Sequence, residues 1–345
     1  MIKLGSTIAI DLGTSSVKVV KGKAGDKGIF VDAYTYIKLP ADYKGFDSIS
    51  QKEAVIRLMR PALRKAGIKG GQCILSISTS DIISRPMILP DMPEQSLREN
   101  VTYELSQYVP IDLEKYVVDY KAIKDDEDES KGRLYIIAAA LPKSLLQDAV
   151  ALLQKLNMKV RAIDLDFNAL TRFFSFIDKR KDLEDSDNMI IDIGHEFTQV
   201  IVYNKNKIYI SRIINHGSND INLLIANALG KNPEDIALMK YTIGENTPPE
   251  VYGAVAGVFE NIVTDIIRII DYFNARYRGR SIKNIYLSGG GVAIGGINEY
   301  LSQALGMPVL VLKPDDWIKC RKNNIKDDWD ISTFTTALGL LLKEK

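Results

Sequence analysis

Short hydrophobic runs alternate along the chain with longer segments of helical periodicity, a pattern that predicts a mixed α/β fold. In the first part, runs of strand length lie at residues 7–11, 16–21, 28–39 and 73–78. A helix is predicted over residues 50–66, because Ser50 and Glu53 form a capping-box pattern near its start and Gly67 follows its end.

A second kind of unit is predicted between residues 83 and 141. The proline-punctuated segment 85–93 is extended, and residues 94–108 have the apolar spacing of a helix. Two further strands, at 116–123 and 133–140, are joined by the charged segment 124–132. We interpret that segment as a solvated hairpin loop rather than an acidic binding tail, so the unit is a βαββ insert.

After the insert, the charged residues 178–188 predict a linker between two halves. The remaining predicted strands are 159–164, 189–193, 200–203, 208–214 and 285–287, and the remaining helices are 145–156, 167–177, 219–229, 251–277 and 332–342. The helix 251–277 has a wide apolar face. This face indicates burial in a core more than contact with a membrane surface, because its acidic neighbours suit lipid poorly.

Two segments of the same pattern open the two halves. Residues 9–20 and 190–202 each contain a hydrophobic strand, then Asp, a hydrophobic residue and Gly, then a polar turn and a second hydrophobic strand. This internal repeat predicts two related domains that face each other across a cleft.

Each predicted hairpin has the residues that a phosphate and a metal ion require. Gly13 and Gly194 lack a Cβ, so the backbone can approach a phosphate, and successive amides in such a turn bind anions. Asp11 and Asp192 end their strands, where they could hold a hydrated Mg²⁺ largely through water. Lys18 can neutralise phosphate charge. Hydroxyl donors come from Thr14, Ser15, Ser16 and Thr198.

A third element is rich in glycine. The strand that ends at Ser288 runs into Gly289, Gly290 and Gly291, and a helix-like pattern follows. Such a turn lets a flat ring and a ribose-phosphate lie against bare backbone. Each of the three elements is a weak signal alone, but together and in this order they predict a nucleotide site.

Composition limits the class of protein. The 345 residues include 45 Lys and Arg and 44 Asp and Glu, a net charge of +1, which excludes a nucleic-acid binder that works through bulk charge. The two cysteines have neither zinc-site nor disulfide-framework spacing and fit a reducing cytosol. No stretch reaches the roughly 18 apolar residues that span a bilayer, and no signal-peptide pattern opens the chain, so we expect an intracellular protein.

The motifs resemble those of the actin, Hsp70 and sugar-kinase ATPase superfamily. Residues 11–18 and 192–198 resemble its phosphate motifs, and 287–292 resembles its adenosine motif. Residues 160–174 and 333–340 fall where its two connecting helices belong, and small Ala337 and Gly339 would allow a close crossing. The resemblance implies ATP and Mg²⁺ as cofactors and an actin-like fold built from a duplicated ribonuclease H-like unit.

The insert narrows the resemblance to PilM-type type IV pilus assembly proteins. The segments that carry it are Leu89–Pro93, Glu99–Val101, Glu104–Glu114, Asp119–Tyr120 and Val160–Leu170. In that family the insert is an extra subdomain shared with the cell-division protein FtsA. FtsA-like proteins also carry a C-terminal membrane-targeting helix, which we do not expect here because the chain stops soon after Leu342.

The same resemblance implies the domain organisation. The first actin-like half covers residues 1–187, with its core at 1–81 and 145–187 and the FtsA-type extra βαββ subdomain at 82–144. The second half covers 188–331. The C-terminal connecting helix, 332–345, returns to the first half.

The family implies an ATP-binding scaffold of the pilus inner-membrane platform, cytoplasmic and peripheral at the inner face of the membrane. Its members bind the N-terminal cytoplasmic peptide of a PilN-type membrane protein, in a groove between the extra subdomain and the first core. We expect that groove near residues 82–90 and the helix 94–108, with strand addition or apolar pockets as the means of docking. Other platform and motor proteins are further expected partners, and the membrane is reached only through partners.

The family's Ala-Glu-x-x-Lys motif, which contacts ribose and adenine, is here Ile236–Lys240, so Lys240 stays and the Glu is missing. Gly217 lies where the family approaches the nucleotide closely. A general base is not evident. Asp164 or Asp166 could orient a water or serve the hinge, and His195 could donate to a γ-phosphate or fill its turn. His216 is interpreted as structural. We therefore expect ATP hydrolysis to be slow or absent.

Other functions of the superfamily remain open. A small-molecule kinase is one alternative, disfavoured by the extra subdomain and by the lack of a recognisable sugar-binding segment. A filament-forming protein is a second. The actin-like cytoplasmic part of a type II secretion platform is a third, disfavoured by the lack of a transmembrane segment.

Overall fold

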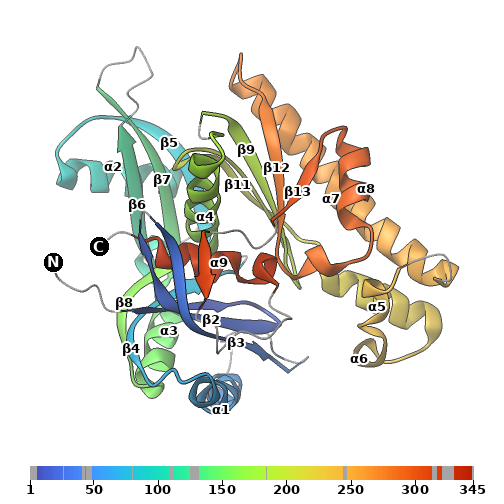
Figure 1. Ribbon diagram of the computed structural model, residues 1–345. Helices are drawn as coiled ribbons and strands as arrows, with labels where there is room; N and C mark the ends of the chain where they lie inside the picture. The colour runs from blue at the N-terminus through green and yellow to red at the C-terminus, as the bar shows by residue number, and fades with distance from the viewer. Residues whose placement is uncertain are drawn as a thin grey trace.

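The computed structural model describes residues 6–25, 27–40, 43, 49–79, 81–108, 112–124, 132–183, 185–243, 247–312, 317–320 and 330–343. They form three sheets with helices packed between and around them (Figure 1).

The first sheet has six strands in the order β14-β3-β2-β1-β4-β8. Their bounds are β1 Thr7–Leu12, β2 Ser16–Gly25, β3 Gly28–Lys38, β4 Gly71–Ile77, β8 Met158–Leu165 and β14 Ile318–Cys320. β1, β2 and β3 are antiparallel neighbours, whereas β4, β8 and β14 join in parallel. Helices α1 (Ile49–Lys65) and α3 (Lys143–Lys155) lie below this sheet in the view of Figure 1.

The second sheet repeats the arrangement, in the order β11-β10-β9-β12-β13. Its strands are β9 Asp187–Ile193, β10 Thr198–Asn204, β11 Lys207–Ile214, β12 Ile282–Ser288 and β13 Val309–Val311. The helices and turns around it are α5 Ser218–Leu229, α6 Pro233–Ile236, η2 Met239–Tyr241, α7 Pro249–Arg276, η3 Gly290–Ala293 and α8 Ile297–Leu305. In both sheets an antiparallel meander is followed by parallel strands, which confirms the predicted duplication.

The apolar face of α7 is buried in the core of the second half, through residues such as Val251, Phe259 and Ile262. Burial confirms the core interpretation of this helix. Over the part of the chain that the structure describes, no helix has the length and hydropathy needed to cross a membrane.

The predicted βαββ insert forms a small unit of its own. Strands β5 (Ile83–Pro90), β7 (Arg133–Pro142) and β6 (Tyr116–Lys124) pair antiparallel in that order, and α2 (Glu94–Tyr108) buries Leu97, Val101 and Leu105 against them. The short turn η1 (Leu113–Lys115) precedes β6. Most of the predicted loop 124–132 lies outside the described residues.

Helices α4 (Asp166–Arg180) and α9 (Ile331–Leu341) cross between the two halves. The crossing is close, because a Cβ at Gly339 would collide with the carbonyl oxygen of Ala169. This confirms the prediction that a small residue permits the contact. α9 also packs on β1, β2 and β4 of the first sheet, and α4 packs on β10 of the second.

Two boundary predictions were wrong in part. The charged segment 178–188 is not all linker, since Asp178 is buried at the end of α4 and accepts hydrogen bonds from Tyr203, Tyr286 and Asn188. Residues 318–320, which we placed in the second half, form β14 and pair with β3 of the first sheet.

Candidate functional site

The two predicted hairpin turns have the same hydrogen-bond geometry. The amide of Gly13 donates to the carbonyl of Ser16 at 3.1 Å, and the amide of Gly194 donates to that of Phe197 at 3.0 Å. A Cβ at Gly194 would lie 2.7 Å from the same carbonyl, so the turn requires glycine. Thr14 and Ser15 are half-buried in the first turn, whereas Ser16 is buried at the start of β2.

Asp11, Asp192 and Asp166 lie within electrostatic range of one another, and Lys18 lies beside the first two. The ammonium of Lys18 is 3.3 Å from the Asp11 carboxylate. Burial lowers the pKa of Lys18, but Asp11, Tyr36 and Asp192 together raise it above the ordinary value. The repeat therefore brings its two carboxylates, one from each half, to one place.

Asp166 is buried and Asp192 is partly buried, and the pKa values of both carboxyl groups are raised. Burial raises the pKa of Asp192 to about 6, with a further rise from Asp11 that Ser288 and Lys18 oppose. Burial also raises the pKa of Asp166 to about 7, against a 2.5 Å hydrogen bond from the Ser78 hydroxyl, and the charges of Asp192 and Asp11 add to the rise. A bound cation would relieve this charge repulsion.

Around the second turn, the start of α5 packs on the hairpin. The amides of Ser218 and Asn219 donate to the carbonyls of Gly194 and His195 at 3.0 and 2.8 Å. Gly217 is needed for this approach, since a Cβ there would collide with the His195 carbonyl. The buried Thr198, which we predicted to contact phosphate, instead donates to the carbonyl of His216 at 2.8 Å and holds the turn.

Lysines and acidic side chains both lie near His195, and the Glu196 carboxylate is 3.5 Å from its Nε2. Burial lowers the pKa of His195 to about 4, and the cations Lys240, Lys38 and Lys18 lower it while Asp220 opposes them. The ring is therefore neutral at pH 7. Lys240 is buried and donates to the carbonyl of Ser218 at 2.8 Å, and burial lowers the pKa of Lys240 to about 8.

The glycine triplet Gly289–Gly291 lies between the second hairpin turn and the start of α9. Gly289 has φ +87°, and a Cβ on it would lie 2.5 Å from the carbonyl oxygen of Ile193 and 3.0 Å from Asp192 Oδ1. Gly291 likewise leaves no room for a Cβ beside Ile193, whereas Gly290 faces open space. The amide of Gly289 donates to the carbonyl of Ser332 at 3.1 Å, which ties this turn to the start of α9.

The structure separates the two candidate water-orienting carboxylates. Asp166 joins the cluster of Asp11 and Asp192, but Asp164 faces a groove on another side of α4. Its carboxylate binds Arg172 at 2.7 Å and Lys343 at 2.9 Å. Burial raises the pKa of Asp164, but the two cations outweigh it and hold the pKa below the ordinary value. These ion pairs favour the structural role at the hinge that the sequence left open for Asp164 over the orientation of a water.

The groove has a volume of about 1830 Å³ and lies between the insert and the first sheet. Strands β6, β7 and β8, helix α4 and the end of α9 line it, and none of its lining residues belongs to β5 or α2, where we expected the peptide groove.

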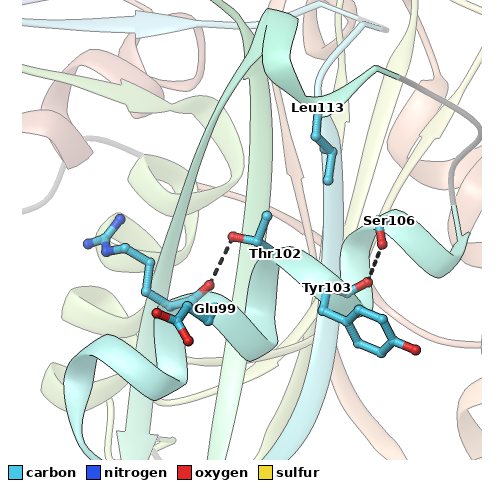
Figure 2. Close-up of a pocket in the computed structure, with 6 residues that line it drawn as sticks. Glu99, Thr102, Tyr103, Ser106 and Leu113 are labelled. Carbon is cyan, nitrogen blue, oxygen red and sulfur yellow. Dashed lines mark hydrogen bonds between the residues drawn. The ribbon is translucent and has the colours of Figure 1, made fainter.

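A smaller pocket of about 400 Å³ does lie on α2, beside Tyr103 and Leu113. There the Thr102 and Ser106 hydroxyls bond to carbonyls of their own helix (Figure 2).

Sequence reasoning missed Ser76, near the end of β4, and Ser78, just after β4, both beside the carboxylate cluster. Ser76 is the register partner of Asp11, and Ser78 bonds to Asp166. The available signal was a hydrophobic strand that ends in serines, since the ends of parallel strands meet at one edge of a sheet.

Comparison with solved structures agrees with this geometry. The chain is similar to a protein of the "PilM-PilN type IV pilus biogenesis complex", with a TM-score of 0.84, 20% identity and 97% of each chain covered. It is also similar to the ethanolamine utilization protein EutJ of Carboxydothermus hydrogenoformans (TM-score 0.58, 15% identity, 99% of this chain and 90% of that chain). MreB 5 of Spiroplasma citri bound to AMPPNP has a TM-score of 0.55 at 12% identity, with 98% of this chain and 95% of that chain covered.

These neighbours share an actin-like fold with the duplicated sheets described above. Residues 9–345 match the family model described as type IV pilus assembly protein PilM. The chain therefore belongs to the PilM family of type IV pilus assembly proteins.

Proposed function

We propose that this protein is a cytoplasmic scaffold of the pilus inner-membrane platform that binds Mg-ATP between its two halves and the N-terminal peptide of a PilN-type membrane protein in its groove. The observation that carries the nucleotide part is the meeting of Asp11 and Asp192, one from each hairpin, beside Lys18. In this proposal the protein reaches the membrane, and the other platform and motor proteins, only through partners.

The residues present fit a magnesium nucleotide. The backbone turns at Gly13 and Gly194, with Thr14 and Ser15, bind phosphate oxygens, and Asp11 and Asp192 hold the ion largely through water. The Mg²⁺, when bound, offsets the phosphate charge.

The nucleoside end is assigned to the second half. Gly290, where a Cβ would meet nothing within 4 Å, and its neighbours offer bare backbone to the ring and ribose. Lys240 has one hydrogen-bond acceptor, the Ser218 carbonyl, among the residues described, so its ammonium has further donors for the nucleotide. The neutral imidazole of His195 can donate one hydrogen bond to a phosphate oxygen.

We assign turnover, if it occurs, to Asp166 as the group that orients water. Its pKa near 7 makes Asp166 a stronger base than an ordinary carboxylate, but the group is partly protonated at neutral pH. Its two oxygens already accept hydrogen bonds from the Ser78 hydroxyl and the Phe167 amide. We expect slow or absent hydrolysis because both Asp166 oxygens already have protein donors, and a slow turnover suits a scaffold whose shape depends on the bound nucleotide.

The peptide is assigned to the groove because two strand edges face it. β6 and β8 are the outer strands of their sheets, and both line the groove. An extended peptide can pair with such an edge and place alternate side chains in apolar pockets, here beside Val117, Val160 and Phe176. Because α4 and the end of α9 line the same groove, its occupant contacts the helices that reach the nucleotide site.

Calorimetry tests the nucleotide assignment. We expect the unaltered protein to bind Mg-ATP and the double variant Asp11→Ala, Asp192→Ala to lose at least tenfold in affinity. Asp148→Ala removes a carboxylate that pairs with Lys52 away from the site and is the matched control. No binding by the unaltered protein, or equal binding by the double variant, contradicts the assignment.

Fluorescence anisotropy with a labelled N-terminal peptide of a PilN-type protein tests the groove, with and without Mg-ATP. Val160 is 38% exposed on β8, so Val160→Glu changes the groove without opening the core and should weaken binding at least tenfold. Tyr103→Ala, in the α2 pocket, should leave binding unchanged. The reverse result would place the peptide on α2.

A further inference from the structure

A row of polar residues in one register crosses the first sheet. Its members are Tyr36 on β3, Lys18 on β2, Asp11 on β1, Ser76 on β4 and Asp164 on β8. Register partners on neighbouring strands lie on the same face, about 4.8 Å apart. Ser76 therefore lies between the carboxylate of the proposed nucleotide site and the carboxylate at the groove.

Ser76 is the member of this row whose hydrogen bonding is incomplete. The residue is 0% exposed, and its Oγ has no hydrogen-bond partner within the described ranges of the chain. Buried hydroxyl groups are nearly always hydrogen-bonded, and where no protein group serves, a water or an ion commonly does.

The neighbour on the groove side does not need this hydroxyl. One oxygen of Asp164 accepts from the Leu165 amide and from Asn168, and the other binds Arg172 and Lys343, at distances from 2.7 to 3.3 Å. The opposite neighbour, Asp11, has an ion pair with Lys18 at 3.3 Å. It is also the carboxylate that we assign to hydrated Mg²⁺, whose retained waters each need hydrogen-bond acceptors.

We infer that Ser76 is a positioning residue for the magnesium nucleotide, whose hydroxyl accepts a hydrogen bond from a water of the ion's hydration shell beside Asp11. The inference rests on the proposed function, because it requires Mg-ATP at this site. In addition, Ser76 should affect only the part of the ATP affinity that Mg²⁺ supplies, and not the affinity for ATP without Mg²⁺.

Ser76→Ala separates this role from a structural one. Titrations with ATP plus Mg²⁺ and with ATP plus EDTA give the gain in affinity that magnesium supplies, and a melting curve without nucleotide gives the stability. We expect Ser76→Ala to melt at the same temperature as the unaltered protein or higher, because it removes an unpaired buried hydroxyl. The gain from magnesium should fall about fivefold, with ATP-EDTA affinity unchanged.

Ser211→Ala is the matched control. Ser211 is also a buried strand serine, but its hydroxyl accepts from Gln199 at 2.8 Å in the second sheet. This variant should melt at a lower temperature and keep the full gain from magnesium.

An unchanged gain in Ser76→Ala, or an equal loss with EDTA, overturns the inference while the proposed function stands. No binding of ATP by the unaltered protein overturns the proposed function and the inference with it.

Discussion

At the scale of single residues, the buried carboxyl group of Asp166 lies within electrostatic range of Asp11 and Asp192. Asp166 has a pKa near 7 in the folded protein, above its ordinary value of 3.8, so the folded state holds a proton that the unfolded chain releases between these values. The stability contribution of this group is therefore complete below about pH 4 and is lost as the pH rises to about 7. A nucleotide-bound cation works in the opposite direction, because it favours the ionised carboxylates.

Asp166→Asn tests this linkage. Without nucleotide, the unfolding free energy of the variant should fall less between pH 4 and pH 7 than that of the unaltered protein. At pH 8 the variant should be the more stable of the two, by at most about 4 kcal/mol. Urea unfolding followed over this pH range measures the effect. The control variant Asp148→Asn should have the same pH profile of stability as the unaltered protein. If Asp166→Asn also had that unchanged profile, the burial of an ionisable Asp166 would be contradicted.

His195 gives a second residue-scale prediction. Its pKa near 4 places its titration well below that of an ordinary histidine, because burial and three lysines oppose its charge. Proton NMR should show this low midpoint without ligand. Mg-ATP should raise the midpoint, since the phosphate groups bring negative charge to the ring. A midpoint that does not move with saturating Mg-ATP would place the phosphates elsewhere.

At the scale of elements, α4 and α9 connect the proposed nucleotide site with the groove. α4 begins at Asp166 in the carboxylate cluster, and α9 begins where Ser332 binds the Gly289 amide. At the other end, Lys343 binds Asp164 in the groove. At Gly339 the backbone of α9 packs directly against the backbone of α4 at Ala169, so we expect the two helices to move together.

Gly339→Ala should therefore destabilise the protein, by about 1–3 kcal/mol, because the new methyl group forces the helices apart. Gly253 is a matched control inside α7, where a Cβ meets nothing within 4 Å. Gly253→Ala should be neutral or stabilising by up to about 1 kcal/mol, since alanine is the better helix former. Chemical denaturation of both variants checks the pair, and equal effects would contradict the close crossing.

Patterns in the sequence predicted most of the elements but not every boundary or long-range contact. The hairpins, the insert and the long helices were predictable because each has a strong period and turn residues of its own. The assignment of Asp164 and Asp166 was not, because it depends on the residue at which β8 ends and α4 begins, which patterns locate only to within about two residues. The partners of Asp178 and the pairing of three-residue β14 depend on contacts distant in sequence, which no local pattern contains.

At the scale of the whole molecule, two similar halves each present a turn and a carboxylate to a shared site, and the insert completes a groove beside it. The insert also contacts the second half directly, because the Tyr135 hydroxyl on β7 donates to the carbonyl of Ile208 on β11. Parts of both halves bound the groove, which Asn206 also lines, and the proposed nucleotide site. A change in the angle between the halves should alter both.

The most direct test of shared binding is a calorimetric titration of Mg-ATP into the two single variants, Asp11→Ala and Asp192→Ala. We predict one nucleotide per chain for the unaltered protein and a loss of at least tenfold in affinity for each variant, because each half contributes a carboxylate to the same ion and phosphates. Full affinity in either variant, or two nucleotides per chain, would contradict a single site held between the halves.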